Sequence, residues 1–209
     1  MSSDIKQDRK SIKIDIGCSS HKMSDYIGID ILKGDSVDIV CDARKLPFGD
    51  DSVDEVYSRY ALEHIPDNLA VITELYRVCK NDALIKLILP HFSNPSWYDD
   101  LTHCYKYSTR SFEHFDSNMR IITGYPDYLP EVNLQVESAK LGWWPLQIIE
   151  RKSLLKRCIL GFINKLISSL ANAHPFFCER IWCGWVGGFY EIEFIIRVKK
   201  TLNSCCQVK

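Results

Sequence analysis

The sequence predicts an α/β fold built on a mostly parallel sheet, and two observations support this. Short β-branched runs recur between residues 11 and 90, and each ends at a glycine, an acid or a turn. A helical apolar period at Asn68–Lys80 then precedes a nearly unbroken apolar run, as expected where a helix joins parallel strands. We therefore expect a single domain over residues 1–209, with halves at 11–90 and 91–198 and a tail at 199–209.

The expected strands of the first half are short and closely spaced. Because Gly17 and Asp30 are near one another in sequence, the helix between the first two strands should be abbreviated or missing. The last run is apolar, which is typical of a strand buried on both faces, and Asn81–Asp82 should turn the chain before it. The strands are expected at Ser11–Ile16, Tyr26–Asp30, Val37–Cys41, Val53–Ser58 and Leu84–Pro90.

The second half is less regular. His91–Asp116 is expected to be a long loop with a short helix near Thr109–Asp116, and Val132–Lys140 alternates as a strand does. Leu154–Ala171 has the strongest helical pattern, with one apolar face and nearby lysines and arginines. An aromatic, glycine-rich segment then precedes the last strand, Tyr190–Val198.

Composition limits the classes of partner and of location. A net charge of -1 gives no general attraction to nucleic acid. The charged N-terminus lacks the apolar stretch of a signal peptide, and no run of residues is apolar enough to span a membrane. The nine cysteines are odd in number and scattered without metal-binding spacing, which favours free thiols and a cytoplasmic location.

The residues that follow the first three strands indicate a ligand site. In an open α/β sheet, ligands bind beyond the carboxyl ends of the strands. Gly17 follows the first strand and lets a ligand approach the backbone. Asp30 ends the second strand, where its carboxylate can receive the hydroxyls of a ribose, and Asp42–Ala43 follow the third.

This order of residues resembles the class I S-adenosylmethionine-dependent methyltransferases, in particular the methyltransferase-11-like branch. Its most specific element is D-A-x-x-L-P-F-x-D-x-S-V-D at Asp42–Asp54. The resemblance implies a Rossmann-like, doubly wound sheet with an antiparallel last strand and S-adenosylmethionine as cofactor. Residues 11–90 would form the cofactor-binding half, and residues 91–198 the acceptor-side half with a helical and aromatic cap insertion at about 141–188.

The resemblance also implies roles for single residues. Asp15, Gly17, Cys18 and Ser19 would line the methionine end of the cofactor. Asp30 would hold the ribose hydroxyls with Ile31 against the adenine face, and Asp42 and Ala43 would contact the adenine edge. Tyr60 would lie beside the sulfonium or the amino group. The glycine loop is G-C-S-S-H and so keeps only Gly17 of the family's glycines. A nicotinamide-binding site would need G-x-G-x-x-G opening a full helix, and both are absent from the sequence.

A base is needed where the methyl acceptor must lose a proton. We expect it beyond the fourth and fifth strands, with His103 as base and Asp100 either as the carboxylate that orients it or as an alternate base. His91 is the second candidate, and a structural role for His103 is the alternative. The spacing of the histidines, acids and Cys104 in this segment matches no standard metal-ligand pattern, so no metal is expected.

The sequence therefore predicts methyl transfer to a small-molecule or lipid- or sugar-linked acceptor. A non-catalytic subunit that binds S-adenosylmethionine is one alternative. The basic, apolar segment 154–188 leaves three possibilities open: a cap on the sheet edge or over the acceptor pocket, a peripheral membrane contact for a methyltransferase acting on a lipid, or a homodimer interface.

Overall fold

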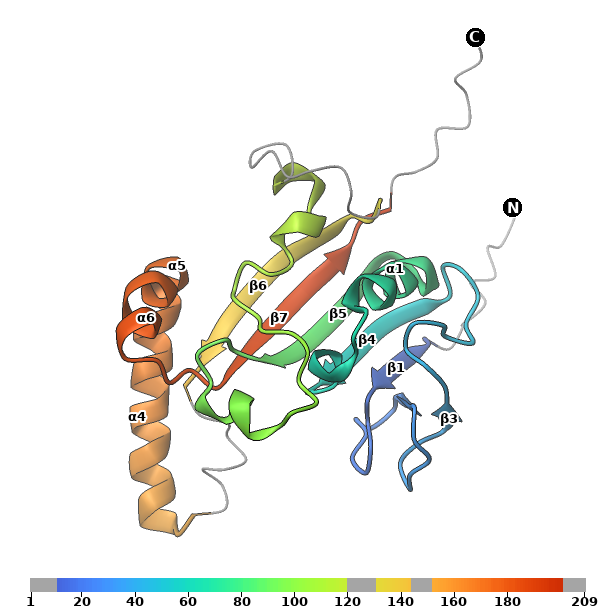
Figure 1. Cartoon of the computed structure of the whole chain (residues 1–209). Coiled ribbons are helices and arrows are strands. Elements are labelled where there is room, and N and C mark those ends of the chain that lie inside the picture. Colours follow the sequence, from blue (N-terminus) through green and yellow to red (C-terminus); the bar gives the residue numbers. More distant parts are fainter. Residues whose placement is uncertain (1–10, 120–130, 144–151, 201–209) are drawn as a thin grey trace, which may run out of the picture.

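A computed structural model describes residues 11–119, 131–143 and 152–200 and shows one seven-stranded sheet (Figure 1). The strand order is β3-β2-β1-β4-β5-β7-β6, and within this sheet only β7 runs against its neighbours. The Rossmann-like, mostly parallel sheet with a reversed last strand is thus confirmed. The strands are β1 (Lys13–Ile16), β2 (Ile27–Asp30), β3 (Ile39–Val40), β4 (Val53–Arg59), β5 (Cys79–Pro90), β6 (Leu134–Gly142) and β7 (Glu191–Val198).

The connection between β1 and β2 is a turn without a helix, as predicted. The backbone N–H groups of Gly17 and Cys18 both donate to the carbonyl of Ile29, at 2.8 and 3.2 Å. The buried Asp15 carboxylate accepts a hydrogen bond from the Met23 N–H at 2.8 Å. These bonds satisfy backbone groups that a helix would otherwise pair.

Helix α1 (Asn68–Val78) joins β4 to β5 and begins at Asp67, whose side chain accepts from the Ala70 N–H at 3.0 Å. Its buried face packs on the sheet. The turn expected at Asn81–Asp82 is instead an irregularity inside the longer strand β5, where the register to β4 shifts and Asp82 has φ +63°.

The two faces of the central strands differ in burial. The prediction that Leu84–Pro90 is buried on both faces is wrong, because Lys86 in its middle pairs with Glu193 of β7 at 2.8 Å on a half-exposed face. Ion pairs between strands occupy this face, whereas apolar side chains fill the other. The buried face carries Val56, Ile85, Leu87, Phe194 and Ile196; the paired face carries Lys13–Glu55, Lys86–Glu193 and Arg197–Glu137.

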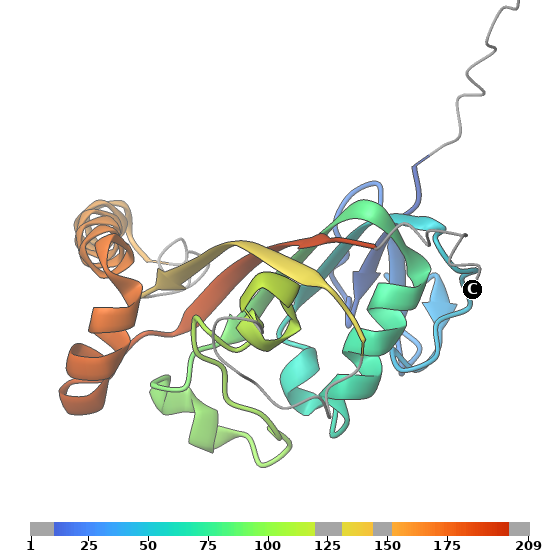
Figure 2. The ribbon, with the colours of Figure 1, turned by 90° about the horizontal axis from the view of Figure 1, so that it is seen from above.

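Residues 91–116 cover the apolar face together with α1, and both lie on the same side of the sheet (Figure 2). Phe112 meets Phe194 of β7 edge-on, with ring centroids 4.8 Å apart. The short helix expected near Thr109–Asp116 is limited to the 3₁₀ turn η3 (Glu113–Phe115). Two further 3₁₀ turns, η1 (Leu62–His64) and η2 (Pro95–Asp99), follow the carboxyl ends of β4 and β5.

The insertion before β7 lies at the end of the sheet opposite β3 (Figure 1). Its helix α4 (Leu154–Ala173) packs on the edge strand β6, where Asn172 bonds both the N–H and the carbonyl of Leu141 at 2.8 Å. Asn172 therefore supplies the pairing that a neighbouring strand would offer. The chain continues through α5 (Pro175–Phe177), the π-helical turn η4 (Cys178–Trp182) and α6 (Cys183–Trp185). Positions 144–151 of the insertion and 201–209 of the expected tail lie outside the described residues.

Candidate functional site

A cavity of about 430 Å³, here called the cofactor cavity, lies at the carboxyl ends of β1 to β4, the position predicted for a ligand. Its wall is mostly apolar, and two carboxylates and one guanidinium stand in it. Seven of the nine predicted cofactor residues border it. The lining residues are Ile16, Gly17, Ser19, Ile29, Asp30, Ile31, Leu32, Cys41, Asp42, Ala43, Arg44, Tyr60, Ala61, His64, Ile65 and Pro66.

Gly17 brings β1 into the cofactor cavity in a left-handed conformation, with φ +72°. Residues with a Cβ rarely adopt this conformation. A Cβ at this position would also lie 2.2 Å from the Cβ of Ala61, which follows β4. Only glycine therefore allows the ends of β1 and β4 to approach one another here.

Asp30 is fixed at the end of β2 by the turn that follows β1. Its Oδ2 accepts from the Ser19 N–H at 3.0 Å, and its Oδ1 accepts from the Leu32 N–H at 2.9 Å. A carboxylate offers about four acceptor positions, so two remain for a ligand. Ile31 and Leu32, which follow Asp30, line the cofactor cavity. They are 65% and 73% exposed, so both apolar side chains are accessible to a ligand.

Asp42 forms a fork-to-fork ion pair with Arg44, at 3.0 Å from Nε to Oδ1 and 2.6 Å from Nη2 to Oδ2. The hydrogen bonds from the Arg44 side chain and backbone lower the pKa of Asp42 below its usual value. Ala43, between them, is buried. Sequence reasoning missed Arg44, because only the pairing shows that it closes this side of the cavity.

Tyr60 follows β4 with φ +52°, an uncommon conformation for a bulky residue. Its hydroxyl donates to Glu191 at the start of β7, and the Arg59 guanidinium lies 4.9 Å from its ring centroid. Burial, together with Glu191, raises the pKa of the phenol, so it stays protonated. These contacts tie Tyr60 to the far half of the sheet and hold it at the cavity wall.

Asp15 and Cys18 are the two predicted cofactor residues that do not border the cofactor cavity. Asp15 holds the turn after β1 through Met23, and burial raises the pKa of its carboxyl. The Cys18 thiol is directed to the carbonyl of Ser36 at 3.6 Å, and burial raises its pKa to about 11. Both side chains therefore stabilise the connection between β1 and β2 and do not line the cofactor cavity.

Glu63, His64 and His103 come together beside the cofactor cavity and form the Glu–His–His cluster. One ligand atom of each residue lies within 4.8 Å of the others, and the His64 and His103 ring centroids are 4.7 Å apart. His64 also lines the cofactor cavity, although its position after β4 suggests only the start of a helix. Burial, with the nearby Asp100 charge, raises the pKa of Glu63 to about 7. Burial and the neighbouring His103 lower the pKa of His64.

The orienting role predicted for Asp100 is corrected by the structure. Its carboxylate accepts from the Thr102 N–H at 2.8 Å and from the Thr102 hydroxyl at 2.6 Å. That hydroxyl lies 2.8 Å from His64 Nδ1, whereas His103 Nδ1 lies 3.1 Å from the Trp97 carbonyl. Asp100 therefore orients His64 through Thr102, and the backbone of Trp97 orients His103.

His91, the second candidate base, is part of a buried structural contact. Its Nε2 lies 3.1 Å from Oε1 of Glu179, which also accepts from the N–H and the hydroxyl of Thr109 at 2.6 and 2.8 Å.

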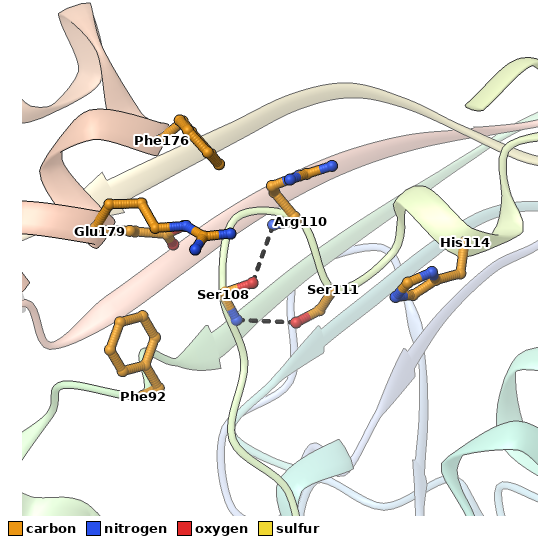
Figure 3. A pocket seen from close by; sticks show the side chains of 8 residues that line it. Phe92, Ser108, Arg110, Ser111, His114, Phe176 and Glu179 are labelled. Carbon is orange, nitrogen blue, oxygen red and sulfur yellow. Dashed lines mark hydrogen bonds between the residues drawn. The ribbon is translucent and has the colours of Figure 1, made fainter. Parts of the chain in front are cut away.

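Glu179 borders a second cavity, of about 330 Å³, between the 108–114 segment and the insertion (Figure 3). This second cavity shares no lining residue with the cofactor cavity; it is lined by Phe92, Ser108, Arg110, Ser111, His114, Phe176, Glu179 and Arg180. The described part of the insertion thus packs on the sheet edge at β6 and borders the second cavity, and none of its residues lines the cofactor cavity.

Comparison with known sequences agrees with this arrangement. Residues 14–87, from β1 to β5, match the family model described as a methyltransferase domain. Demethylmenaquinone methyltransferase of Streptomyces avermitilis is 39% identical over 56 residues, which cover 27% of this chain and 23% of that relative. The chain thus matches less than a quarter of the relative's length.

Comparison with solved structures concerns the fold. The YcgJ protein of Bacillus subtilis superposes with a TM-score of 0.51 at 19% identity, over 92% of this chain and 93% of that chain. A Galdieria sulphuraria protein described as a proposed sarcosine dimethylglycine methyltransferase gives 0.53 at 15% identity, over 93% and 79%. The cyclase SpnF gives 0.50 at 11% identity, over 91% and 76%. Proteins with this fold therefore carry names for more than one reaction.

Proposed function

We propose that this chain transfers a methyl group from S-adenosylmethionine to a small-molecule or lipid- or sugar-linked acceptor, because residues 14–87 match the family model described as a methyltransferase domain. One observation supports the proposal above others: Gly17, Asp30, Asp42 and Tyr60 follow four different strands and border one cavity. The cofactor cavity is within the size range of small-molecule sites, and its apolar wall with polar groups at the rim suits a nucleoside.

The residues of the cofactor cavity have distinct proposed tasks. Asp30 receives the ribose hydroxyls, Ile31 covers the base, and Asp42 with Ala43 meets the edge of the adenine. S-adenosylmethionine supplies a methyl group on a sulfonium, which is already an activated leaving group. The protein's task is then to hold the acceptor in line with that methyl group, which can contribute ~7–11 kcal/mol to lowering the barrier.

The acceptor is proposed to enter beside Tyr60 and the Glu–His–His cluster. His103 remains the proposed base for an acceptor that must lose a proton, and it lies against His64 at the cavity wall. Asp100 acts as a positioning residue through Thr102 and His64. A base in this position contributes ~10²–10⁴-fold to the rate.

Binding of S-adenosylmethionine, measured by isothermal titration, tests the placement of the cofactor. We expect Asp30→Ala and Asp42→Ala each to weaken binding by ~1–3 kcal/mol, roughly 5- to 150-fold in Kd, because polar ligand groups lose their partner. Asp35→Ala is the matched control, since Asp35 is an exposed acid of the same region outside the cavity lining. Wild-type affinity in both site variants would show that the cofactor lies elsewhere.

That titration, combined with an assay for S-adenosylhomocysteine, separates the enzyme from the non-catalytic alternative. A protein that binds S-adenosylmethionine and forms S-adenosylhomocysteine with cell extract is a methyltransferase. Binding without product, in extract and across a panel of acceptors, favours a cofactor-binding partner subunit, which the reduced glycine loop also suggests.

A peripheral position on an anionic membrane is a second proposal, and the surface of α4 favours it. Leu155, Ile159, Phe162, Leu166 and Leu170 form one exposed apolar stripe, with lysines and arginines beside it. Among the described helices, none has the length and apolarity to cross a bilayer. A cytoplasmic location stays a prediction, based on cysteines that are free thiols throughout the described chain.

A further inference from the structure

We propose that the Glu–His–His cluster binds one divalent transition-metal ion of the Zn²⁺ class. Glu63 and His64 belong to the 3₁₀ turn after β4, and His103 belongs to the loop after η2. The sequence separation of 39 positions between His64 and His103 explains why motif spacing did not predict the site. Two imidazoles and one carboxylate are a ligand set that such ions take in proteins.

The buried carboxylate is the first observation that points to a cation. Glu63 is 1% exposed, and its Oε2 has no hydrogen-bond partner among the residues that the structure describes. Burying an unpaired polar atom costs free energy, and a charged one costs far more. A cation bound between Glu63 and the two histidines would supply the missing partner.

The hydrogen bonds behind the two rings are the second observation. The Thr102 hydroxyl donates its proton to Asp100, so at His64 it can only accept, and His64 Nδ1 must carry the proton. His103 Nδ1 faces a carbonyl, that of Trp97, and must also carry a proton. With Nδ1 used as the donor in both rings, Nε2 is the atom through which each ring could bind a metal. This arrangement, with the second nitrogen bonded to a carbonyl or an acid-linked group, is typical of metal-binding histidines.

The geometry needs only a small contraction. Ligand atoms at about 2.0–2.2 Å from a tetrahedral ion lie roughly 3.3 Å apart. One ligand atom of each residue now lies within 4.8 Å of the others, so the site would contract by up to roughly 1.5 Å when it binds the ion. The Trp97 ring packs on His103 with centroids 4.6 Å apart and shields one side of the site.

Three protein ligands leave one coordination position open, as in catalytic zinc sites. Because His64 also lines the cofactor cavity, an oxygen or nitrogen of the acceptor bound at that position would lie beside the transferred methyl group. A bound hydroxyl would lose its proton to solvent more readily, since the ion stabilises the oxyanion. This role rests on the proposed function, whereas metal binding itself does not. His103 would then act as a ligand rather than as the base.

Equilibrium dialysis of the full chain against Zn²⁺, and the visible spectrum of the Co²⁺-loaded protein, test the proposal. We expect one ion per chain and a tetrahedral Co²⁺ spectrum. Glu63→Gln and His103→Ala should each weaken binding at least tenfold. Thr102→Val should weaken it about tenfold, as outer-shell changes do, and Thr102→Ser should restore it. His21→Ala is the control, because His21 is exposed and its side chain bonds only to its neighbour Ser20 within the described part of the chain.

The proposal fails if wild-type protein binds no ion, or if the Glu63 and His103 variants bind as tightly as wild type while circular dichroism shows them folded. Titration with S-adenosylmethionine is run on the same samples. Cofactor binding without metal binding refutes only the metal site. Metal binding without cofactor binding refutes the proposed function and leaves the site in place.

Discussion

Gly17 is the residue whose replacement should damage the cofactor cavity most directly. Gly17→Ala places a Cβ 2.2 Å from that of Ala61 and forces a side-chain-bearing residue to φ +72°. The left-handed conformation costs ~1–2 kcal/mol, and overpacking adds ~1–3 kcal/mol. We expect a loss of about 2–5 kcal/mol in the free energy of unfolding, measured with urea.

A double-mutant cycle separates the two costs of that change. Ala61→Gly removes the clashing Cβ and leaves the Ala61 Cα 3.5 Å away, so the Gly17→Ala/Ala61→Gly protein should regain the overpacking part only. Gly49→Ala is the matched control, because nothing lies within 4 Å of a Cβ built there. A Gly17→Ala protein as stable as the control would contradict this account of the position.

Residues at strand ends were predictable from the sequence for a physical reason. A parallel sheet brings its carboxyl ends to one edge, so Gly17, Asp30 and Asp42 had to converge once the strands were located. No such regularity predicts the direction in which a side chain within a turn points. Cys18 is turned away from the cofactor cavity by its own bond to Ser36, which no spacing reveals.

At the scale of elements, the two faces of the central strands differ in burial. The connection between β1 and β2 is a turn without a helix, and one face of the central strands is half exposed. The chain fills that face with paired charges such as Lys86–Glu193, where a fully covered sheet would carry apolar residues. The half-exposed face could not be predicted from Leu84–Pro90, because Lys86 is the one charged residue in this otherwise apolar run.

Helix α4 is the element whose apolar residues divide between two surfaces. The sequence predicts one apolar face, whereas in the structure only part of it is covered. Ile163 and Ile167 are half-buried beside the buried Asn164, but Phe162 is 69% exposed. A helix that is apolar on more than one side has surface for a further contact.

We expect that contact to be an anionic lipid surface, because Lys156 and Lys165 flank the exposed stripe and Trp185 beyond it is 88% exposed. The chain should co-sediment with vesicles containing phosphatidylglycerol and much less with pure phosphatidylcholine. Phe162→Gln should reduce the bound fraction severalfold, since each buried apolar side chain contributes ~1.5–3 kcal/mol.

Leu101→Gln is the control for that measurement, because Leu101 is 98% exposed but lies in the loop after η2, away from α4. Sedimentation velocity gives the competing outcome. A dimer that Phe162→Gln dissociates, with no binding to either vesicle, would assign the stripe to a second copy of the chain instead.

At the scale of the whole molecule, the mostly parallel sheet could be predicted from the pattern of short runs and acids in residues 11–90, since connections between parallel strands are short and regular. The packing of the described residues between 91 and 200 could not be predicted from the sequence. It depends on pairings across long sequence distances, such as Glu179 with His91 and Thr109, and single-sequence periodicity carries no trace of them. The Glu–His–His cluster escaped prediction for the same reason.

Glu179 of the insertion bonds to His91 after β5 and to Thr109 in the loop before η3. Its ionisation should therefore contribute to the free energy of unfolding, and this contribution should depend on pH. Burial alone would raise its pKa, but hydrogen bonds from His91 and Thr109 outweigh this and lower it. The nearby thiols of Cys178 and Cys183 have raised pKa values and stay neutral at acid pH. Because the pKa of Glu179 is lower in the folded protein, its contribution to the free energy of unfolding is complete above the usual glutamate pKa of about 4.3. That contribution is lost as the pH falls through the pKa of Glu179 in the folded protein.

Urea unfolding of wild type and Glu179→Gln at about pH 7 and about pH 4 or below measures this contribution. At pH 7 the variant should be less stable by ~1.5–3 kcal/mol, the usual contribution of a hydrogen bond to a charged group. The difference between the two proteins should shrink towards acid pH, because the wild-type carboxylate is then protonated as well. Glu113→Gln is the control, since Glu113 pairs with Arg110 at the surface of the same region, where such pairs contribute ~0–1 kcal/mol. A difference that stays constant with pH would mean that Glu179 stabilises by packing, and that its charge does not hold the insertion to β5.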